Sequence, residues 1–129
     1  MNTQALTAYQ QTSVHTQVEG ASPHKLITML LDGALERTQK AKLAMKSGDI
    51  ATKGELIGRA IDIVGSLDAY LDLEQGGEIA ENLRALYEYI VLKLFEANTS
   101  NDSDLLDEVV TLLTEVRAGW KGIEGGAED

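Results

Sequence analysis

Residues 22–36 read SPHKLITMLLDGALE, and this stretch decides how the first part of the chain folds. Ser22 is a residue type that caps helix N-termini, and Pro23 suits the first helical position because its missing N–H would be unpaired there anyway. Apolar side chains then recur every three or four residues, which places them on one helix face: Leu26, Ile27, Leu30, Ala34, Ala41 and Met45. The stretch therefore predicts a long amphipathic helix that begins at Pro23.

The same helical spacing continues along the chain, and no segment alternates as a strand does. Gly48 can end the first helix, and Asp49 can cap the next one, which we expect to run to about residue 74. Gly76-Gly77 then breaks the chain before a third helix, and the polar run NTSNDSD at 98–104 precedes a fourth. Long helices with short connections predict an all-α fold, an antiparallel up-down four-helix bundle.

The core faces expected for the three later helices follow the same spacing. The second helix should bury Ile57, Ala60, Ile61, Val64, Leu67 and Leu71. The third should bury Ile79, Leu83, Leu86, Ile90 and Leu94, and the fourth Leu105, Val109, Leu112, Val116 and Trp120.

The bundle domain is expected to span residues 22–123. Residues 1–21 are polar, with Leu6 and Tyr9 as isolated apolar anchors, and predict either a short N-terminal helix or a mobile arm. The acidic tail, residues 124–129, is expected to be disordered.

Composition excludes several classes of protein. The chain of 129 residues has no cysteine, which excludes a disulfide framework and thiolate metal sites. Its net charge of −10 argues against nucleic acid as a partner. The N-terminus lacks the basic and then apolar run of a signal peptide, and no apolar stretch approaches the roughly 20 residues that cross a bilayer. We therefore expect a cytoplasmic protein that does not insert into a membrane.

His24 is the first candidate for chemistry. A di-metal site in a bundle needs Glu-x-x-His pairs, and neither His24 nor His15 has a glutamate three residues before it. The acidic run that begins at Asp102 has Asp107 where a calcium loop needs glycine. His24 is therefore expected to be an exposed or helix-capping residue, and a phosphotransfer histidine is the competing hypothesis. We expect no enzyme, no metal and no cofactor.

Some apolar residues lie outside the expected core faces: Met29, Leu56, Ile63, Tyr89 and Leu92. They are either ordinary exposed apolar residues or contacts for the N-terminal segment, or they line a groove that accepts an amphipathic helix of a partner. Gly33 lies one turn from Met29 and would let another backbone approach closely.

Two groups of motifs in the chain are specific when taken together. The first is SPHKLI at 22–27, followed by Met29-Leu30 and by DGA at 32–34. The second is GGEIA at 76–80, followed by Asn82-Leu83, Leu86-Tyr87 and Tyr89. With Asn98, Asn101-Asp102 and Trp120, they resemble the FliS family of flagellar export chaperones over about residues 6–123.

The resemblance implies a cytoplasmic bundle that binds the disordered C-terminal segment of flagellin. Binding would prevent premature polymerisation and aid delivery to the flagellar type III export gate. The resemblance also implies that Leu6 and Tyr9 cover part of the bundle and take part in export-gate contacts. By motif and helical wheel, the groove-lining residues would be Ile27, Met29, Leu30, Gly33, Leu56, Ala60 and Ile63. Leu31 departs from the family, which often has an aromatic residue there. An anti-sigma factor as a further partner and a homodimer stay open.

Overall fold

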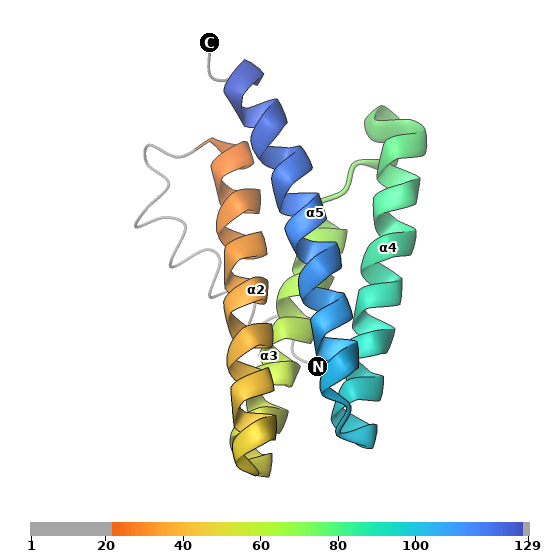
Figure 1. Ribbon diagram of the computed structural model, residues 1–129. Coiled ribbons are helices and arrows are strands. Elements are labelled where there is room, and N and C mark those ends of the chain that lie inside the picture. The colour runs from red at the N-terminus through yellow and green to blue at the C-terminus, as the bar shows by residue number, and fades with distance from the viewer. Residues whose placement is uncertain (1–21, 128–129) are drawn as a thin grey trace.

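The computed structural model describes residues 22–127, apart from the side chains of residues 121 and 123–127. This range forms four helices, with no strand among the described residues: α2 (Pro23–Ser47), α3 (Ile50–Ala69), α4 (Leu73–Ser100) and α5 (Ser103–Ala127). Successive helices run in opposite directions (Figure 1). Both α2 and α4 pack against α3 and α5, so α2 and α4 are diagonal to each other. The prediction of an antiparallel up-down four-helix bundle is confirmed.

The predictions for residues 1–21, including Leu6 and Tyr9, fall outside the described residues. At the other end, α5 continues to Ala127, past residue 123, where the bundle domain was expected to end.

Local capping chemistry sets the bounds of α2 and the start of α3, as expected from the sequence. The Ser22 hydroxyl accepts a hydrogen bond from the Lys25 backbone N–H at 3.2 Å. Gly48 ends α2 in the left-handed region, with φ of 79°. The Asp49 side chain accepts a hydrogen bond from the Thr52 backbone N–H. Hydrogen bonding by the Thr52 side chain, and then by this N–H, lowers the pKa of Asp49.

The connection between α3 and α4 differs from the prediction. α3 ends at Ala69 instead of about residue 74, and Leu71 is half-buried in the connection. The Asp72 carboxylate accepts hydrogen bonds at 3.1 Å from the backbone N–H groups two and three residues later, so α4 begins at Leu73. An aspartate in this capping position starts the helix before the two glycines that were expected to separate the helices.

Gly76 and Gly77 therefore lie inside the first turns of α4. Gly77 has φ of 53° and ψ of −128°, which kinks the helix. A Cβ atom on Gly76 would lie 2.7 Å from the Cβ atom of Ala80, so the kink leaves no room for a side chain there.

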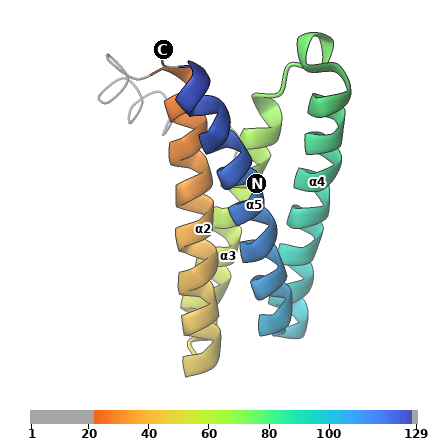
Figure 2. The ribbon, with the colours of Figure 1, turned by 45° about the horizontal axis from the view of Figure 1, so that its top comes forward.

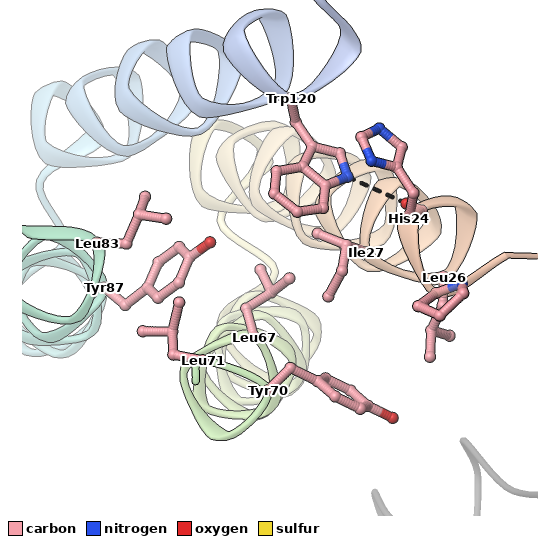
Figure 3. A pocket seen from close by; sticks show the side chains of 10 residues that line it. His24, Leu26, Ile27, Leu67, Tyr70, Leu71, Leu83, Tyr87 and Trp120 are labelled. Carbon is pink, nitrogen blue, oxygen red and sulfur yellow. Dashed lines mark hydrogen bonds between the residues drawn. The ribbon is translucent and has the colours of Figure 1, made fainter. Parts of the chain in front are cut away.

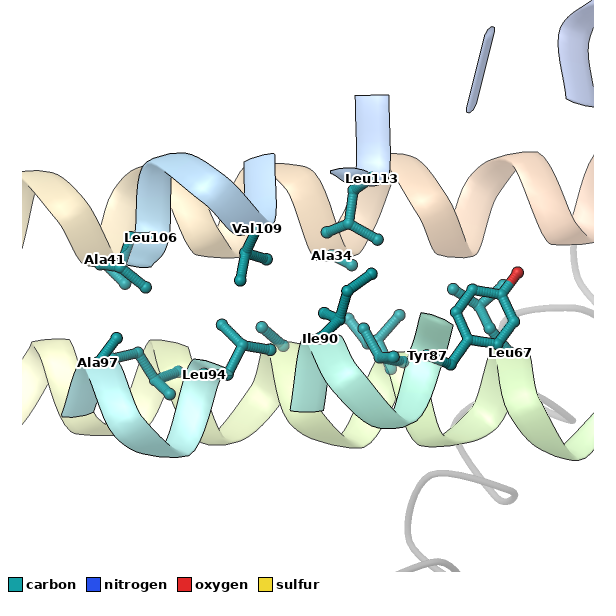
Figure 4. Packing of buried hydrophobic residues seen from close by; sticks show 14 of the residues in the cluster. Ala34, Ala41, Leu67, Tyr87, Ile90, Leu94, Ala97, Leu106, Val109 and Leu113 are labelled. Carbon is teal, nitrogen blue, oxygen red and sulfur yellow. The ribbon is translucent and has the colours of Figure 1, made fainter. Parts of the chain in front are cut away.

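The core lies between all four helices (Figure 4), and its residues are Leu30, Leu31, Ala34, Ala41, Met45, Ile57, Ala60, Ile63, Val64, Leu67, Tyr87, Ile90, Leu94, Ala97, Leu106, Val109 and Leu113. One prediction of a core residue was wrong. Ile79 is 72% exposed, because it follows the kink at the end where α4 stands apart from α5 (Figures 1 and 2). On α5, Leu106 and Leu113 occupy the core centre, while Leu105 and Leu112 are half-buried beside it.

Lys53 closes the end of the bundle opposite this gap. Its side chain is only 5% exposed. The ammonium donates hydrogen bonds to the Asn98 carbonyl at 3.1 Å and to Asn101 Oδ1 at 3.0 Å. Asn101 is the C-terminal cap of α4, where the helix dipole favours a positive charge. Lys53 thus ties the start of α3 to the turn between α4 and α5.

We expect Lys53→Met to lower the free energy of unfolding by about 1–3 kcal/mol, because two partly buried hydrogen bonds between α3 and the end of α4 would be lost. Urea unfolding followed by circular dichroism measures this. Lys40→Met is the matched control, since Lys40 pairs with Glu36 at 3.9 Å on the surface, where such pairs contribute about 0–1 kcal/mol. Equal losses in the two variants would contradict a structural role of the buried ammonium.

Candidate functional site

Two hollows follow one another along the seam between α3 and α4. One has a volume of about 530 Å³ and is lined by Glu55, Gly58, Arg59, Ile61, Asp62 and Phe95. The other has a volume of about 200 Å³ and is lined by Val64, Gly65, Asp68, Tyr87, Glu88 and Val91. We call these residues together the α3/α4 groove.

Two glycines leave the α3 side of this groove bare. A Cβ atom added to Gly58 or to Gly65 would meet nothing within 4 Å. The two residues are seven positions apart, about two helical turns, so they lie on the same face of α3. A partner helix could therefore approach the α3 backbone closely at two levels.

The α4 side of the groove exposes one large apolar side chain. Phe95 is 55% exposed, and Leu92, which lies one turn before it but outside the lining residues, is 60% exposed. Leu92 was expected to lie off the core, and the structure confirms this. Exposed aromatic and leucine side chains beside a bare helix backbone form a surface that would gain by burial under another protein.

The rim of the groove is charged and mainly acidic. Glu55, Asp62 and Glu88 line it with Arg59 as the one basic residue among the lining side chains. Asp68 accepts a hydrogen bond from Arg84 Nε at 3.2 Å, which holds the end of α3 to α4. A helix in this groove would best carry basic or neutral side chains along its edges.

A separate cavity opens at the end of the bundle where α2 begins and the last turns of α5 lie (Figure 3). We call it the end cavity. Its volume is about 330 Å³, and its lining residues are Pro23, His24, Leu26, Ile27, Leu67, Tyr70, Leu71, Leu83, Tyr87 and Trp120. Tyr87 lines both this cavity and the α3/α4 groove, so the two features adjoin.

His24 forms part of the cavity wall by stacking on Trp120. The two rings are 4.4 Å apart between centroids and 11° from parallel. Trp120 Nε1 also donates a hydrogen bond to the His24 carbonyl at 3.0 Å (Figure 3). The expectation of an exposed or capping histidine was wrong, because Ser22 caps α2 and the indole covers the imidazole. This packing gives the phosphotransfer hypothesis no support.

The residues proposed from the sequence as groove-lining lie mostly between α2 and α3. Ile27 lines the end cavity, and Met29 and Leu56 are half-buried. A Cβ atom on Gly33 would lie 3.6 Å from Ile63 Cδ1, so the space beside this glycine is filled by α3. Three of the proposed residues, Leu30, Ala60 and Ile63, belong to the core. Partner binding by these residues stays a prediction.

None of the residues that line the groove was identified from the sequence as a partner-binding residue, and Gly58, Gly65 and Phe95 are the most informative omissions. Ile61 had been assigned to the core, and the structure places it half-buried at the edge of the core and in the groove. The spacing of Gly58 and Gly65 could have predicted this surface. Two glycines that are two turns apart lie on the same helix face and leave it without side chains.

The described residues hold no group of three or more His, Cys, Asp or Glu side chains that could bind a metal ion. Over the same part of the chain, every helix is too short or too polar to cross a membrane.

The comparisons with known proteins agree with one another. The family described as "Flagellar protein FliS" matches residues 5–127. The flagellar secretion chaperone FliSB of Pseudomonas aeruginosa is 55% identical over 119 residues, which cover 92% of this chain and 94% of the relative. The flagellar secretion chaperones FliS of Vibrio cholerae and Salmonella typhimurium are 44% and 46% identical, over 92% and 90% of this chain and 88% and 87% of the relatives. This chain belongs to the FliS family of flagellar secretion chaperones.

Proposed function

We propose that this chain binds the C-terminal segment of flagellin in the cytoplasm and places an amphipathic helix of that segment in the α3/α4 groove. The observation that carries the proposal is that exposed Phe95 on α4 lines the groove together with the bare backbone at Gly58 on α3, and exposed Leu92 lies one turn before Phe95. Covering the segment prevents premature polymerisation and keeps flagellin available for the flagellar type III export gate.

The spacing of the two glycines supports helix-in-groove recognition. Gly58 and Gly65 are about 10.5 Å apart along α3, which matches apolar side chains at positions i and i+7 of a bound helix. Burial of Phe95 and Leu92 would each contribute about 1.5–3 kcal/mol when complete. Contributions of this size offset the cost of ordering a disordered segment.

The other partners follow from the family resemblance. Leu6 and Tyr9 are proposed to contact the export gate while the bundle holds the cargo. An anti-sigma factor and a second copy of this chain are further candidate partners. Competition with flagellin in a binding assay would assign either of them to the same groove.

The assignment of flagellin predicts that isothermal titration gives a one-to-one complex with flagellin and no complex with flagellin that lacks its C-terminal segment. Phe95→Ser should weaken the affinity about tenfold or more, because it removes the largest exposed apolar side chain of the groove. Leu43→Ser is the matched control, since Leu43 is an exposed apolar residue of α2 away from the groove. Unchanged affinity for the truncated flagellin would refute the proposed cargo.

Two substitutions of Gly58 test flagellin binding and the stability of the fold separately. Gly58→Ala should raise the free energy of unfolding by up to about 1 kcal/mol, because alanine is the better helix former and its Cβ finds open space. Gly58→Phe should block flagellin binding while the chain stays folded. Gly119→Phe is the control, since Gly119 also faces open space but lies on α5. Full affinity of Gly58→Phe would show that the cargo helix lies elsewhere.

A further inference from the structure

Tyr87 stands at the junction of the α3/α4 groove and the end cavity. Its ring packs in the core, and its hydroxyl points into the end cavity, toward the space between Leu67, Leu83 and Trp120 (Figure 3). The side chain is only 3% exposed. The two binding features thus meet at a phenol group that is almost completely buried.

The hydroxyl of Tyr87 has no hydrogen-bond partner among the described residues. Tyr89, two residues later, differs in this respect, because its hydroxyl donates to Glu108 on α5. The Tyr87 oxygen is not among the fully enclosed, unpaired polar atoms of the described residues, so it opens to the end cavity. A group that enters the cavity can therefore accept a hydrogen bond from this hydroxyl.

The chemistry of that partner is restricted. Burial raises the pKa of Tyr87 to about 12, and the nearby charge of Asp68 adds to the effect. The hydroxyl therefore stays protonated at neutral pH and acts as a donor. The same negative charge disfavours a carboxylate as the acceptor. A neutral carbonyl oxygen fits best.

The rest of the cavity wall selects an apolar group. Leucine, isoleucine and aromatic side chains line the cavity into which the Tyr87 hydroxyl points, and its volume of about 330 Å³ far exceeds the roughly 10–15 Å³ that one water molecule needs. The cavity is therefore large enough to admit an apolar side chain. Inside a helix the backbone carbonyls are already bonded, whereas the last four are free, so the carbonyl must come from the end of a helix or from extended chain.

We propose that the end cavity receives one leucine- or phenylalanine-sized side chain from the last turn of the bound flagellin helix, and that the Tyr87 hydroxyl donates a hydrogen bond to a free backbone carbonyl of that turn. This inference rests on the proposed function of the α3/α4 groove. It also fixes the direction of the bound helix, because the cavity adjoins the groove at the C-terminal end of α3. The flagellin helix runs parallel to α3 and antiparallel to α4.

Removing one oxygen atom tests the hydrogen bond. Tyr87→Phe should weaken the affinity for a flagellin C-terminal peptide about threefold to tenfold, the loss expected for one hydrogen bond. The midpoint of urea unfolding of the free protein should stay the same or rise, because the hydroxyl is unpaired there. Tyr89→Phe, the matched control, removes a hydroxyl outside the cavity and should leave the affinity unchanged. If Phe95→Ser weakens binding and Tyr87→Phe does not, the cavity proposal is overturned and the proposed function stands.

A small probe tests the end cavity without flagellin, so it separates the cavity proposal from the proposed binding of flagellin. N-acetyl-leucinamide carries an apolar side chain and neutral carbonyls, and N-acetylglycinamide lacks the side chain. Trp120 is the only tryptophan of the chain and lines the cavity, so its emission reports occupancy. The leucine compound should shift the emission saturably at millimolar concentration, more weakly in Tyr87→Phe, and the glycine compound should not. A leucine response without flagellin binding would refute the proposed cargo and keep the cavity. Equal responses to the two compounds, or none, would overturn the cavity proposal.

The direction is tested with two flagellin peptides that carry a photoreactive phenylalanine near the start or near the end of the groove-binding helix. Only the second should cross-link to residues of the end cavity. Cross-linking of the first peptide to the cavity would overturn the parallel orientation.

Discussion

The bundle depends on a positive charge held inside it at one end. The Lys53 ammonium bonds to the Asn98 carbonyl and to Asn101, and so joins the first turn of α3 to the end of α4 and to the turn that leads into α5. Lys42 pairs with Asp107 near the same end and joins α2 to α5. A buried ammonium is tolerated only when its hydrogen bonds are satisfied, so these contacts require one arrangement of the helix ends.

At the opposite end of the bundle, polar contacts hold the helices in two separate pairs. The end cavity lies between these pairs. Arg117 donates to Asp32 at 2.7 Å and, with the stacking of Trp120 on His24, holds α5 to α2. Arg84 and Asp68 hold α4 to α3. The bundle is therefore closed by the Lys53 contacts at one end and opens into the end cavity at the other.

The fold could be predicted from the sequence because most of its determinants are local. Ser22 and Asp49 cap helices through bonds that span three residues, and Gly48 ends a helix by its own backbone freedom. The connection after α3 was mispredicted because two signals compete there, and the Asp72 cap outweighs the glycine pair. On α5 the leucine pairs 105–106 and 112–113 widen the apolar face, so helical periodicity alone does not fix which residue of each pair is central.

The candidate site was harder to predict because it uses residue types that also have structural explanations. Phe95 follows the buried Leu94 directly, and only the packing of α3 against α4 decides which of the two faces solvent. Glycine usually lowers the stability of a helix. At Gly58 and Gly65, however, the missing side chain leaves the α3 backbone bare. Predicted residues such as Ala60 and Ile63 lie in the core because α3 is apolar over much of its circumference, and a wheel cannot tell a buried face from a groove.

The kink at Gly77 has a consequence for how the chain can vary in length. It separates the first turn of α4 from the long segment that carries Tyr87, Ile90 and Leu94 into the core. Because the backbone changes direction at Gly77, the rotational register of the long segment does not depend on the residues before it. An insertion or deletion between Ala69 and Gly77 can be absorbed by the connection, whereas one inside the long segment would turn its core residues away from their neighbours. Between α3 and the core segment of α4, changes of length are therefore expected on the N-terminal side of Gly77.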